Sequence, residues 1–285
     1  MTSRLAPAKV NLYLHVAAPD ARRYHPLQSL VMFADIGDEV ALSAGESRLT
    51  LDGPFAAGLS SGDDNLILKA VRRFAAAAGV NVDRALHLTK NLPVASGLGG
   101  GSADAGAVLH LLRQAVAPDM SDADLGAIAA GIGADGVMCL WNRSAFAEGY
   151  GEILTPVAMP ELPCVLINPR VECSTAAVYS GFDHLGRFEG IDAKAEFDRL
   201  STIDAVIAAL KCTRNDLEPA AIRQQPVIAD VLASLNGQPQ TLLARMSGSG
   251  ATCFALCANP DAAETLSHRM QALWPAAWVQ ACTLG

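Results

Sequence analysis

The sequence is poor in aromatic residues and in positive charge. Only 5% of its 285 residues are Phe, Trp or Tyr, and 21 Lys and Arg stand against 29 Asp and Glu, which gives a net charge of −8. An acidic chain lacks the long-range field that attracts nucleic acids or anionic lipid surfaces. We therefore expect no nucleic-acid partner, although backbone N–H groups can still bind a phosphate locally.

Long apolar runs and paired cysteines are also missing. No stretch approaches the roughly 18 apolar residues of a membrane span, and Arg4, Lys9, Asn11 and His15 interrupt the apolar core that a signal peptide needs. The seven cysteines are scattered and form no C-x-x-C pair, which disfavours disulfides and zinc sites. These absences predict a cytoplasmic protein with reduced thiols and no membrane partner.

The remaining composition indicates a folded chain with two domains. Hydrophobic residues make up 51% of the sequence and charged residues 18%, which excludes a disordered protein. Domains average about 150 residues, so this length suggests two. Pro163 and Pro169 flank a short apolar strand, and we place the boundary there, with domains at residues 1–160 and 161–285. The final strand, helix and strand indicate a small α+β sandwich, within an α/β fold overall.

Periodicity and turn residues predict the main elements. The expected strands and helices include the following. Strands are expected at residues 5–16 and 27–44, the second interrupted near Gly37, and a hairpin at 137–141 and 145–157. Helices are expected after a cap at Asp63 or Asp64, after a cap at Ser102, after Ser121, near 202–210, 216–224 and 227–235, and after a cap at Asn259 with Pro260 as the first helical residue.

The strongest local signal for chemistry is a run of glycines, Gly97-Leu98-Gly99-Gly100-Gly101-Ser102. Glycines let the backbone approach a ligand closely, and N–H groups at a helix N-terminus bind phosphate. No Gly-Lys-Ser/Thr follows, so this is not a Walker loop. It also fits a dinucleotide fingerprint poorly, because Ser102 replaces the third glycine and no acidic residue ends a second strand about 20 positions on. A phosphate site is favoured over a glycine-rich turn without a ligand.

Two polar positions could serve phosphoryl transfer. Lys9 and Asn11 lie two residues apart on a predicted strand and share a face. Asp135 stands among small residues in Gly-Ile-Gly-Ala-Asp-Gly. An ammonium neutralises developing charge and a carboxylate orients or deprotonates a hydroxyl, so the two together suit a kinase. Taken singly, a solvated lysine and a turn aspartate are the simpler interpretations.

Two loops add weaker signals. Ser247-Gly248-Ser249-Gly250 offers backbone donors next to a buried strand, and is otherwise a tight turn. Tyr24-His25 follows the first strand in a polar loop, where an aromatic ring can stack on a base and a histidine can read a base edge. Alone, that pair is interpreted as a surface loop.

These segments in this order resemble the GHMP kinase superfamily over nearly the whole chain. The matching segments are PAKVNLYLHV, YHPLQSL, PVASGLGGGSADA, GADGVMCLW, AFAEGYGEIL and RMSGSGATCFAL. The resemblance implies a ribosomal-protein-S5-like nucleotide-binding N-terminal domain and a ferredoxin-like C-terminal domain. It implies transfer of the ATP γ-phosphate, with Mg²⁺, to the 2-hydroxyl of 4-diphosphocytidyl-2-C-methyl-D-erythritol, in the non-mevalonate isoprenoid route. The sequence identifies no Mg²⁺ ligand, and it leaves open a monomer or a homodimer.

The same resemblance assigns the site residues. It implies that Lys9 and Asp135 are the catalytic pair. The residues implied for ATP are Pro93, Val94, Ala95, Ser96, Gly97, Leu98, Gly99, Gly100, Gly101, Ser102 and Ala103, with Asn65 and Lys90 at the adenosine. The residues implied for the phosphate acceptor are Asn11 near the reacting hydroxyl, His25 at the cytosine edge, Tyr24 and Tyr179 on its two faces, and Thr175 at a helix start.

The sequence departs from the family pattern at two places, and two other functions stay open. Arg22-Arg23 replace the usual Asp-Gly before Tyr24, and the usual GADVP reads GADGV, which removes a proline just after Asp135. Another GHMP kinase, acting on homoserine, mevalonate or a sugar, would have no use for Tyr24-His25. A non-catalytic nucleotide sensor would need no Lys9 and Asp135 pair.

Overall fold

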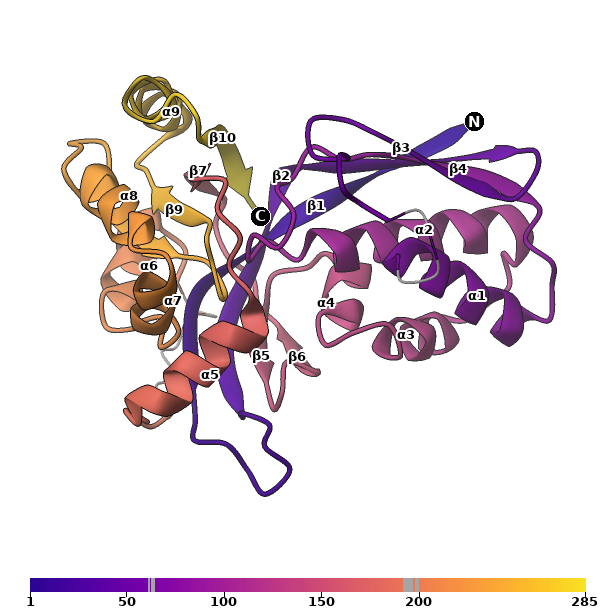
Figure 1. Ribbon diagram of the computed structural model, residues 1–285, viewed down its shortest axis with the longest axis horizontal. Helices are drawn as coiled ribbons and strands as arrows, with labels where there is room; N and C mark the ends of the chain where they lie inside the picture. Colours follow the sequence, from indigo (N-terminus) through magenta and orange to yellow (C-terminus); the bar gives the residue numbers. More distant parts are fainter. Residues whose placement is uncertain (61, 63–64, 192–196, 198–199) are drawn as a thin grey trace. The chain divides into compact units, whose positions relative to one another are not determined.

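The structure is a computed structural model that describes residues 1–60, 62, 65–191, 197 and 200–285. Figure 1 shows its elements. Their bounds are β1 (Thr2–Val16), β2 (Leu27–Ala44), β3 (Arg48–Asp52), α1 (Leu66–Ala78), β4 (Arg84–Thr89), α2 (Gly100–Val116), α3 (Asp122–Ala130), α4 (Gly136–Trp141), β5 (Ala145–Glu148), β6 (Ile153–Pro156), β7 (Leu162–Asn168), α5 (Thr175–Leu185), α6 (Ile203–Leu210), α7 (Glu218–Gln224), α8 (Val227–Asn236), β8 (Leu243–Met246), β9 (Cys253–Leu256), α9 (Pro260–Leu273) and β10 (Trp278–Leu284).

The chain packs into two compact units that are not contiguous in sequence. Unit 1 comprises residues 1–9, 36–94 and 99–142, and unit 2 comprises residues 10–35, 95–98 and 143–285. The predicted domains, 1–160 and 161–285, do not follow this division. The reason is that β1 and β2 each run from one unit into the other.

Unit 1 is a sheet covered by helices. β4 pairs antiparallel with the second half of β2 and parallel with β3, with Val40 opposite Leu88 and Leu86 opposite Leu49. α1 packs against α2 and α3, and α2 packs against α4; Figure 1 shows α1 and α2 beneath β3 and β4. The buried side chains of α1, Ile67, Ala70 and Phe74, recur at helical spacing and form its packed face.

Unit 2 contains the antiparallel strand order β10-β7-β9-β8. With α5 to α8 between β7 and β8, and α9 between β9 and β10, this is the expected ferredoxin-like arrangement. The strands bury one face against the helices, where Val165 and Ile167 of β7 pack with Phe182 of α5 and Val231 of α8. The first half of β2 also pairs with β5, which forms a hairpin with β6.

Several predicted elements are wrong in detail. Residues 136–141 form helix α4 instead of a strand, since a six-residue apolar run has no periodicity to separate the two forms. α2 is capped by Gly99, whose φ is 66°, and Ser102 lies inside the helix. β2 runs unbroken through Gly37, where a Cβ would stand 2.1 Å from the Ala6 carbonyl oxygen of β1. Glycine there allows close approach of two strands rather than a break.

Two predicted helix starts are confirmed, and a third lies outside the residues that the structure describes. The side chain of Ser121 accepts a hydrogen bond from the N–H of Asp124 at the start of α3, and Asn259 caps α9 with Pro260 as its first residue. Asn65 caps α1; the predicted caps Asp63 and Asp64 lie outside the described residues. Within the part of the chain that the structure describes, no helix has the length and hydropathy of a membrane span.

We predict that Gly136→Ala destabilises unit 1. A Cβ at this position would lie 2.1 Å from the carbonyl oxygen of Ala129, which belongs to the α3 backbone and cannot move without distorting that helix. We expect a loss of about 1–3 kcal/mol in the free energy of unfolding, measured by urea denaturation. Gly133→Ala is the control, because its Cβ would meet nothing within 4 Å. Equal stability of the two variants would contradict this packing.

Candidate active site

The glycine-rich segment leads directly into the N-terminus of α2. Gly99 caps the helix with a left-handed backbone, and no side chain caps its first N–H groups. The first N–H groups of any helix have no partner within the helix, and the helix dipole places partial positive charge there. The 17-residue α2 therefore presents backbone donors that fit an anion such as a phosphate.

Lys9 and Asp135 lie at this helix end. The Nζ atom of Lys9 is 3.4 Å from Oδ2 of Asp135, and the lysine side chain is buried while the aspartate is 36% exposed. A Cβ on Gly99 would stand 3.2 Å from Cε of Lys9 and 3.4 Å from Sγ of Cys139. The catalytic pair that the resemblance implied is thus assembled in unit 1, against the glycine that caps α2.

The backbone around Asp135 is fixed by neighbouring elements. Lys69 of α1 donates from Nζ to the carbonyl oxygen of Ile132 at 2.6 Å, which ties the loop before Asp135 to α1. Asp135 precedes α4 and its backbone oxygen accepts from the N–H of Cys139, but its carboxylate caps no N–H group. The carboxylate is therefore available to Lys9 and to solvent.

Residues 95–98, the first part of the glycine-rich segment, belong to unit 2, where the loop Ser247–Gly250 holds them. The Ser247 hydroxyl donates to the carbonyl oxygen of Gly97 at 3.1 Å, and the Thr252 N–H donates to the carbonyl oxygen of Ser96 at 3.1 Å. A Cβ on Gly97, whose φ is 78°, would lie 2.3 Å from the Ser247 carbonyl oxygen. The chain enters unit 2 at Ala95, with φ of 49°, and leaves it after the buried Leu98.

Asn11 belongs to the same group of residues in unit 2. Its N–H donates to the Ser247 hydroxyl at 3.1 Å, and its side-chain amide donates to the Ser29 hydroxyl at 2.7 Å. Ser29 donates in turn to the carbonyl oxygen of Tyr13. These contacts orient the amide, so that its oxygen lies on the side of Gly248, whose Cβ would be 3.2 Å away.

The predicted cytosine residues are grouped around α5 in unit 2. The rings of His25 and Tyr179 are 5.1 Å apart, and the hydroxyl of Thr175 hydrogen-bonds that of Ser249 at 2.9 Å. Nδ1 of His25 lies 3.0 Å from the carbonyl oxygen of Ala17, which fits an Nδ1–H donor. Its Nε2 lies 3.3 Å from the carboxylate of Asp183, a partner that sequence reasoning missed.

Tyr24 lies on the exposed side of its loop. It is 63% exposed, and its ring meets that of Tyr150 edge-on at 5.8 Å. Asp20 organises this loop by accepting from the N–H groups of Arg22 and Tyr24 and from the Tyr150 hydroxyl. Those hydrogen bonds, the one from Tyr150 first, lower the pKa of Asp20 to about 2. Arg23, where the family usually has glycine, adopts the left-handed φ of 65°.

Lys90 and Asn65 have structural partners in unit 1. The side chain of Lys90 is buried and donates to Asp38 and Asp104. Asn65 caps α1 by accepting from the N–H of Ile67 and donates to the carbonyl oxygen of Ser60. Contacts of both residues with adenosine stay predictions. The buried Asp104 could have been noticed, since it stands on the apolar face of a predicted helix, where an unpaired carboxylate is costly.

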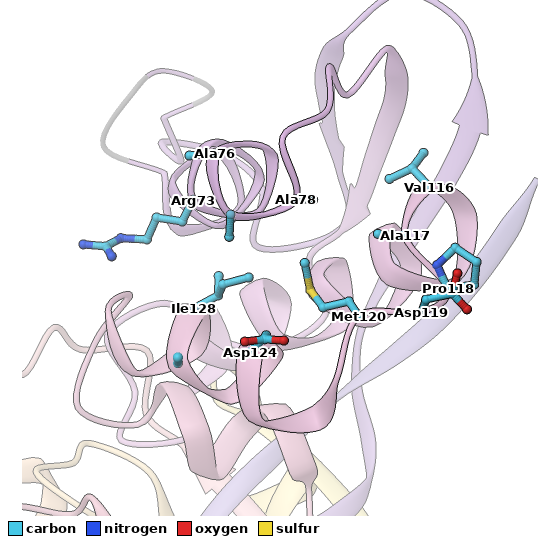
Figure 2. A pocket seen from close by; sticks show the side chains of 12 residues that line it. Arg73, Ala76, Ala78, Val116, Ala117, Pro118, Asp119, Met120, Asp124 and Ile128 are labelled. Atoms are coloured by element: carbon cyan, nitrogen blue, oxygen red, sulfur yellow. The ribbon is translucent and has the colours of Figure 1, made fainter.

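A large groove lies elsewhere in unit 1. Its volume is about 840 Å³, and it is lined by the alanines at the end of α1, by residues 116–120 and by Asp124 and Ile128 of α3. Figure 2 shows it beside Met120 and Arg73. It lies near Val116 at the far end of α2, about 24 Å along the helix from Gly100. It holds none of the predicted site residues.

Two family matches cover much of the chain. Residues 65–143 match the GHMP kinases N terminal domain, and residues 195–276 match the GHMP kinases C terminal domain. A 4-diphosphocytidyl-2-C-methyl-D-erythritol kinase of Caulobacter sp. (strain K31) is 50% identical over 98% of this chain and 97% of its own. One of Dinoroseobacter shibae is 46% identical over 95% of this chain and 92% of its own.

Solved structures agree with these matches. A crystal structure of a 4-(cytidine 5'-diphospho)-2C-methyl-D-erythritol kinase is 32% identical with a TM-score of 0.78, covering 100% of this chain and 99% of the other. A homoserine kinase from Cytophaga hutchinsonii, 21% identical over 98% of this chain and 93% of its own, shares the fold with a TM-score of 0.70. The chain therefore belongs to the 4-diphosphocytidyl-2-C-methyl-D-erythritol kinases of the GHMP kinase superfamily.

Proposed function

We propose that this chain transfers the γ-phosphoryl group of ATP to the 2-hydroxyl of 4-diphosphocytidyl-2-C-methyl-D-erythritol, a step of the non-mevalonate isoprenoid pathway. The observation that carries the proposal is the Lys9 and Asp135 pair, 3.4 Å apart, beside the glycine that caps α2. A base and a cation next to an anion-binding helix end are the groups that phosphoryl transfer to an alcohol needs.

The reaction requires one proton transfer and one displacement at phosphorus. Asp135 accepts the proton of the 2-hydroxyl while the hydroxyl oxygen of the acceptor forms a bond to the γ-phosphorus of ATP. The bond between the γ-phosphorus and the oxygen that bridges it to the β-phosphate breaks, which releases ADP. Lys9 orients the Asp135 carboxylate and neutralises charge on the transferred group. The exposed edge of Asp135 leaves room for a hydroxyl to approach.

Backbone groups bind the nucleotide phosphates in this proposal. The N–H groups at the start of α2 and in the preceding loop donate to phosphate oxygens, and Gly97 and Gly99 keep side chains out of the way. Mg²⁺ would bind together with ATP, held by the phosphates and by one or two protein oxygens, and would neutralise the phosphate charge. The structure offers the uncapped helix end as a cradle of fitting charge.

His25 and its neighbours would recognise the cytosine. The Ala17 carbonyl oxygen lies against Nδ1 and the Asp183 carboxylate against Nε2, so both ring nitrogens have acceptors that hold the ring, and its Nε2 edge is where the base would meet it. Tyr179 lies beside the His25 ring, and Tyr24 is exposed and able to cover the other face of a bound ring. Asn11 would contact the acceptor near its hydroxyl.

The test is ADP release by the purified chain with ATP, Mg²⁺ and one acceptor at a time. The acceptors are 4-diphosphocytidyl-2-C-methyl-D-erythritol, homoserine, mevalonate and galactose. We expect turnover with the cytidyl compound alone. Turnover only with another acceptor would assign a different GHMP kinase reaction, and ATP binding without turnover on any of the four would favour the nucleotide sensor. The oligomeric state, monomer or homodimer, and the cytoplasmic location stay predictions.

We predict that Asp135→Asn removes turnover but spares ATP binding. The amide keeps the size of the side chain and cannot accept the hydroxyl proton, so kcat should fall by at least about a hundredfold. The Kd of ATP, measured by calorimetry, should change by less than about threefold. Asp119→Asn, in the groove at the far end of α2, is the control for a surface carboxylate. Near-normal kcat in Asp135→Asn would remove the base from this assignment.

We predict that His25→Ala raises the KM of the cytidyl acceptor and leaves that of ATP nearly unchanged. The histidine edge would recognise the base, whereas ATP would bind at the glycine segment, so we expect an increase of about tenfold or more for the acceptor alone. His184→Ala is the matched control, because this exposed histidine lies on the same helix as Tyr179 and hydrogen-bonds the Ser180 carbonyl oxygen of that helix. Equal increases in both KM values would speak against the cytosine contact.

A further inference from the structure

A buried ion cluster lies behind the phosphate segment in unit 1. It consists of Asp38 of β2, Lys90 after β4 and Asp104 of α2, each no more than 3% exposed. The Nζ atom of Lys90 is 2.7 Å from Oδ2 of Asp104 and also donates to Oδ2 of Asp38. Nothing in the proposed chemistry uses these three charges, and burying them is costly unless they are paired.

Asp38 fixes the chain just before the glycine segment. Its Oδ1 accepts from the N–H of Asn91 at 2.6 Å and from the N–H of Leu92 at 2.8 Å. The backbone of Lys90 is bound as well, since its N–H donates to the Asp52 carbonyl oxygen and its own carbonyl accepts from Phe55. The first residues of the segment that leads to Gly97 therefore cannot move independently of Asp38.

Asp104 brings the start of α2 to the same cluster. It lies in the second turn of the helix, four residues after Gly100. A Cβ on Gly100 would stand 3.0 Å from Nζ of Lys90 and 3.4 Å from Oδ2 of Asp38, so the ammonium lies directly against the first residue of α2. The cluster thus connects the residues before the glycine segment with the helix that follows it.

The cluster holds two carboxyl groups for one ammonium. Burial alone would lower the pKa of Lys90, but the charges of Asp104 and Asp38 outweigh it and raise that pKa. Burial, together with the charge of Asp38, raises the pKa of Asp104 to about 7 against the attraction of Lys90. Oδ1 of Asp104 is buried with no hydrogen-bond partner among the described residues. The helices packed against α2 carry other charged or titratable groups. Lys69 and Arg73 of α1 extend to the loop at Ile132 and Gly131, and α4 places the buried Cys139 thiol on this side.

We propose that this ion cluster positions the ATP-binding segment, with Lys90 and Asp104 holding the start of α2 against the residues that precede the glycines. Lys90 and Asp104 are therefore positioning residues, and Lys90 acts on the nucleotide through the backbone rather than by direct contact. The proposal rests on the proposed binding of ATP phosphates at this segment. Its structural part, the connection across the segment, is measurable without any substrate.

The test compares Asp104→Ala with Asp104→Asn. Alanine keeps the helix and the Lys90–Asp38 pair but cuts the connection to α2, whereas asparagine retains an oxygen for Lys90. We expect Asp104→Ala to raise the KM of ATP by about tenfold with little change in kcat or in the acceptor KM, and Asp104→Asn to restore it to within about threefold. Asp122→Ala, which removes a surface ion pair with Arg113, is the control.

Amide hydrogen exchange of residues 91–103 in the ATP-free chain gives the second readout. Asp104→Ala should exchange faster there than wild type, and Asp104→Asn should not. An unchanged ATP KM in Asp104→Ala, equal increases in both KM values, or unchanged exchange would overturn the proposal. If the wild-type chain phosphorylates none of the acceptors but Asp104→Ala still exchanges faster than wild type, the positioning role is retained and the proposed function is discarded.

We also predict that Asp104 makes stability depend on pH. Its folded pKa of about 7 lies above the ordinary value of 3.8, so the folded state keeps a proton that the unfolded chain has lost. This contribution is complete below about pH 4, falls as the pH rises toward about 7 and is absent above that. Urea unfolding from about pH 5 to 8 should show this decline in wild type, and Asp104→Asn should remove it. An identical pH profile in the two proteins would contradict the raised pKa.

Discussion

The candidate site depends on two glycines, Gly97 and Gly99, whose missing side chains let neighbouring residues pack directly against the backbone. At Gly99 the packed Lys9 and Cys139 side chains leave no room for a Cβ without displacement, and at Gly97 the Ser247 carbonyl oxygen occupies that position. Both glycines also have positive φ, which other residues adopt only with strain. Each glycine therefore permits close packing within its own unit: Gly99 against the Lys9 side chain in unit 1, and Gly97 against the Ser247 backbone in unit 2.

Most residues that determine the geometry of the site do not carry its chemistry. Lys69 holds the loop before Asp135, Asp20 holds the loop of Tyr24 and His25, and Asp38 holds the entrance to the glycine segment. Each makes hydrogen bonds to backbone groups, and Asp38 also pairs with the side chain of Lys90. Groups of this kind reduce the conformations available to the loops that carry the predicted site residues, and such ordering before binding lowers the entropic cost of positioning reactants.

The sequence predicted elements well where pattern and local chemistry agreed. The ferredoxin-like C-terminal domain, the caps at Ser121 and Asn259, and the Lys9 and Asp135 pair all carried clear local signals or a family resemblance. It failed at residues 136–141, where a short apolar run is equally suited to helix and strand. It also could not place Lys90, because Asp38 and Asp104 are distant in sequence and only the tertiary fold brings them to it.

The two departures from the family pattern lie in loops whose backbone is held in different ways. At position 23 the family usually has glycine, and here Arg23 adopts a left-handed conformation at some cost, while Asp20 accepts hydrogen bonds from the flanking N–H groups. At position 136 the change runs the other way. Gly136 permits a close contact with Ala129 that any side chain would prevent, so the glycine itself is needed for α4 to pack on α3 in this way. The backbone before Tyr24 is therefore held by hydrogen bonds to a neighbouring carboxylate, whereas the backbone after Asp135 depends on the absence of a side chain at one position.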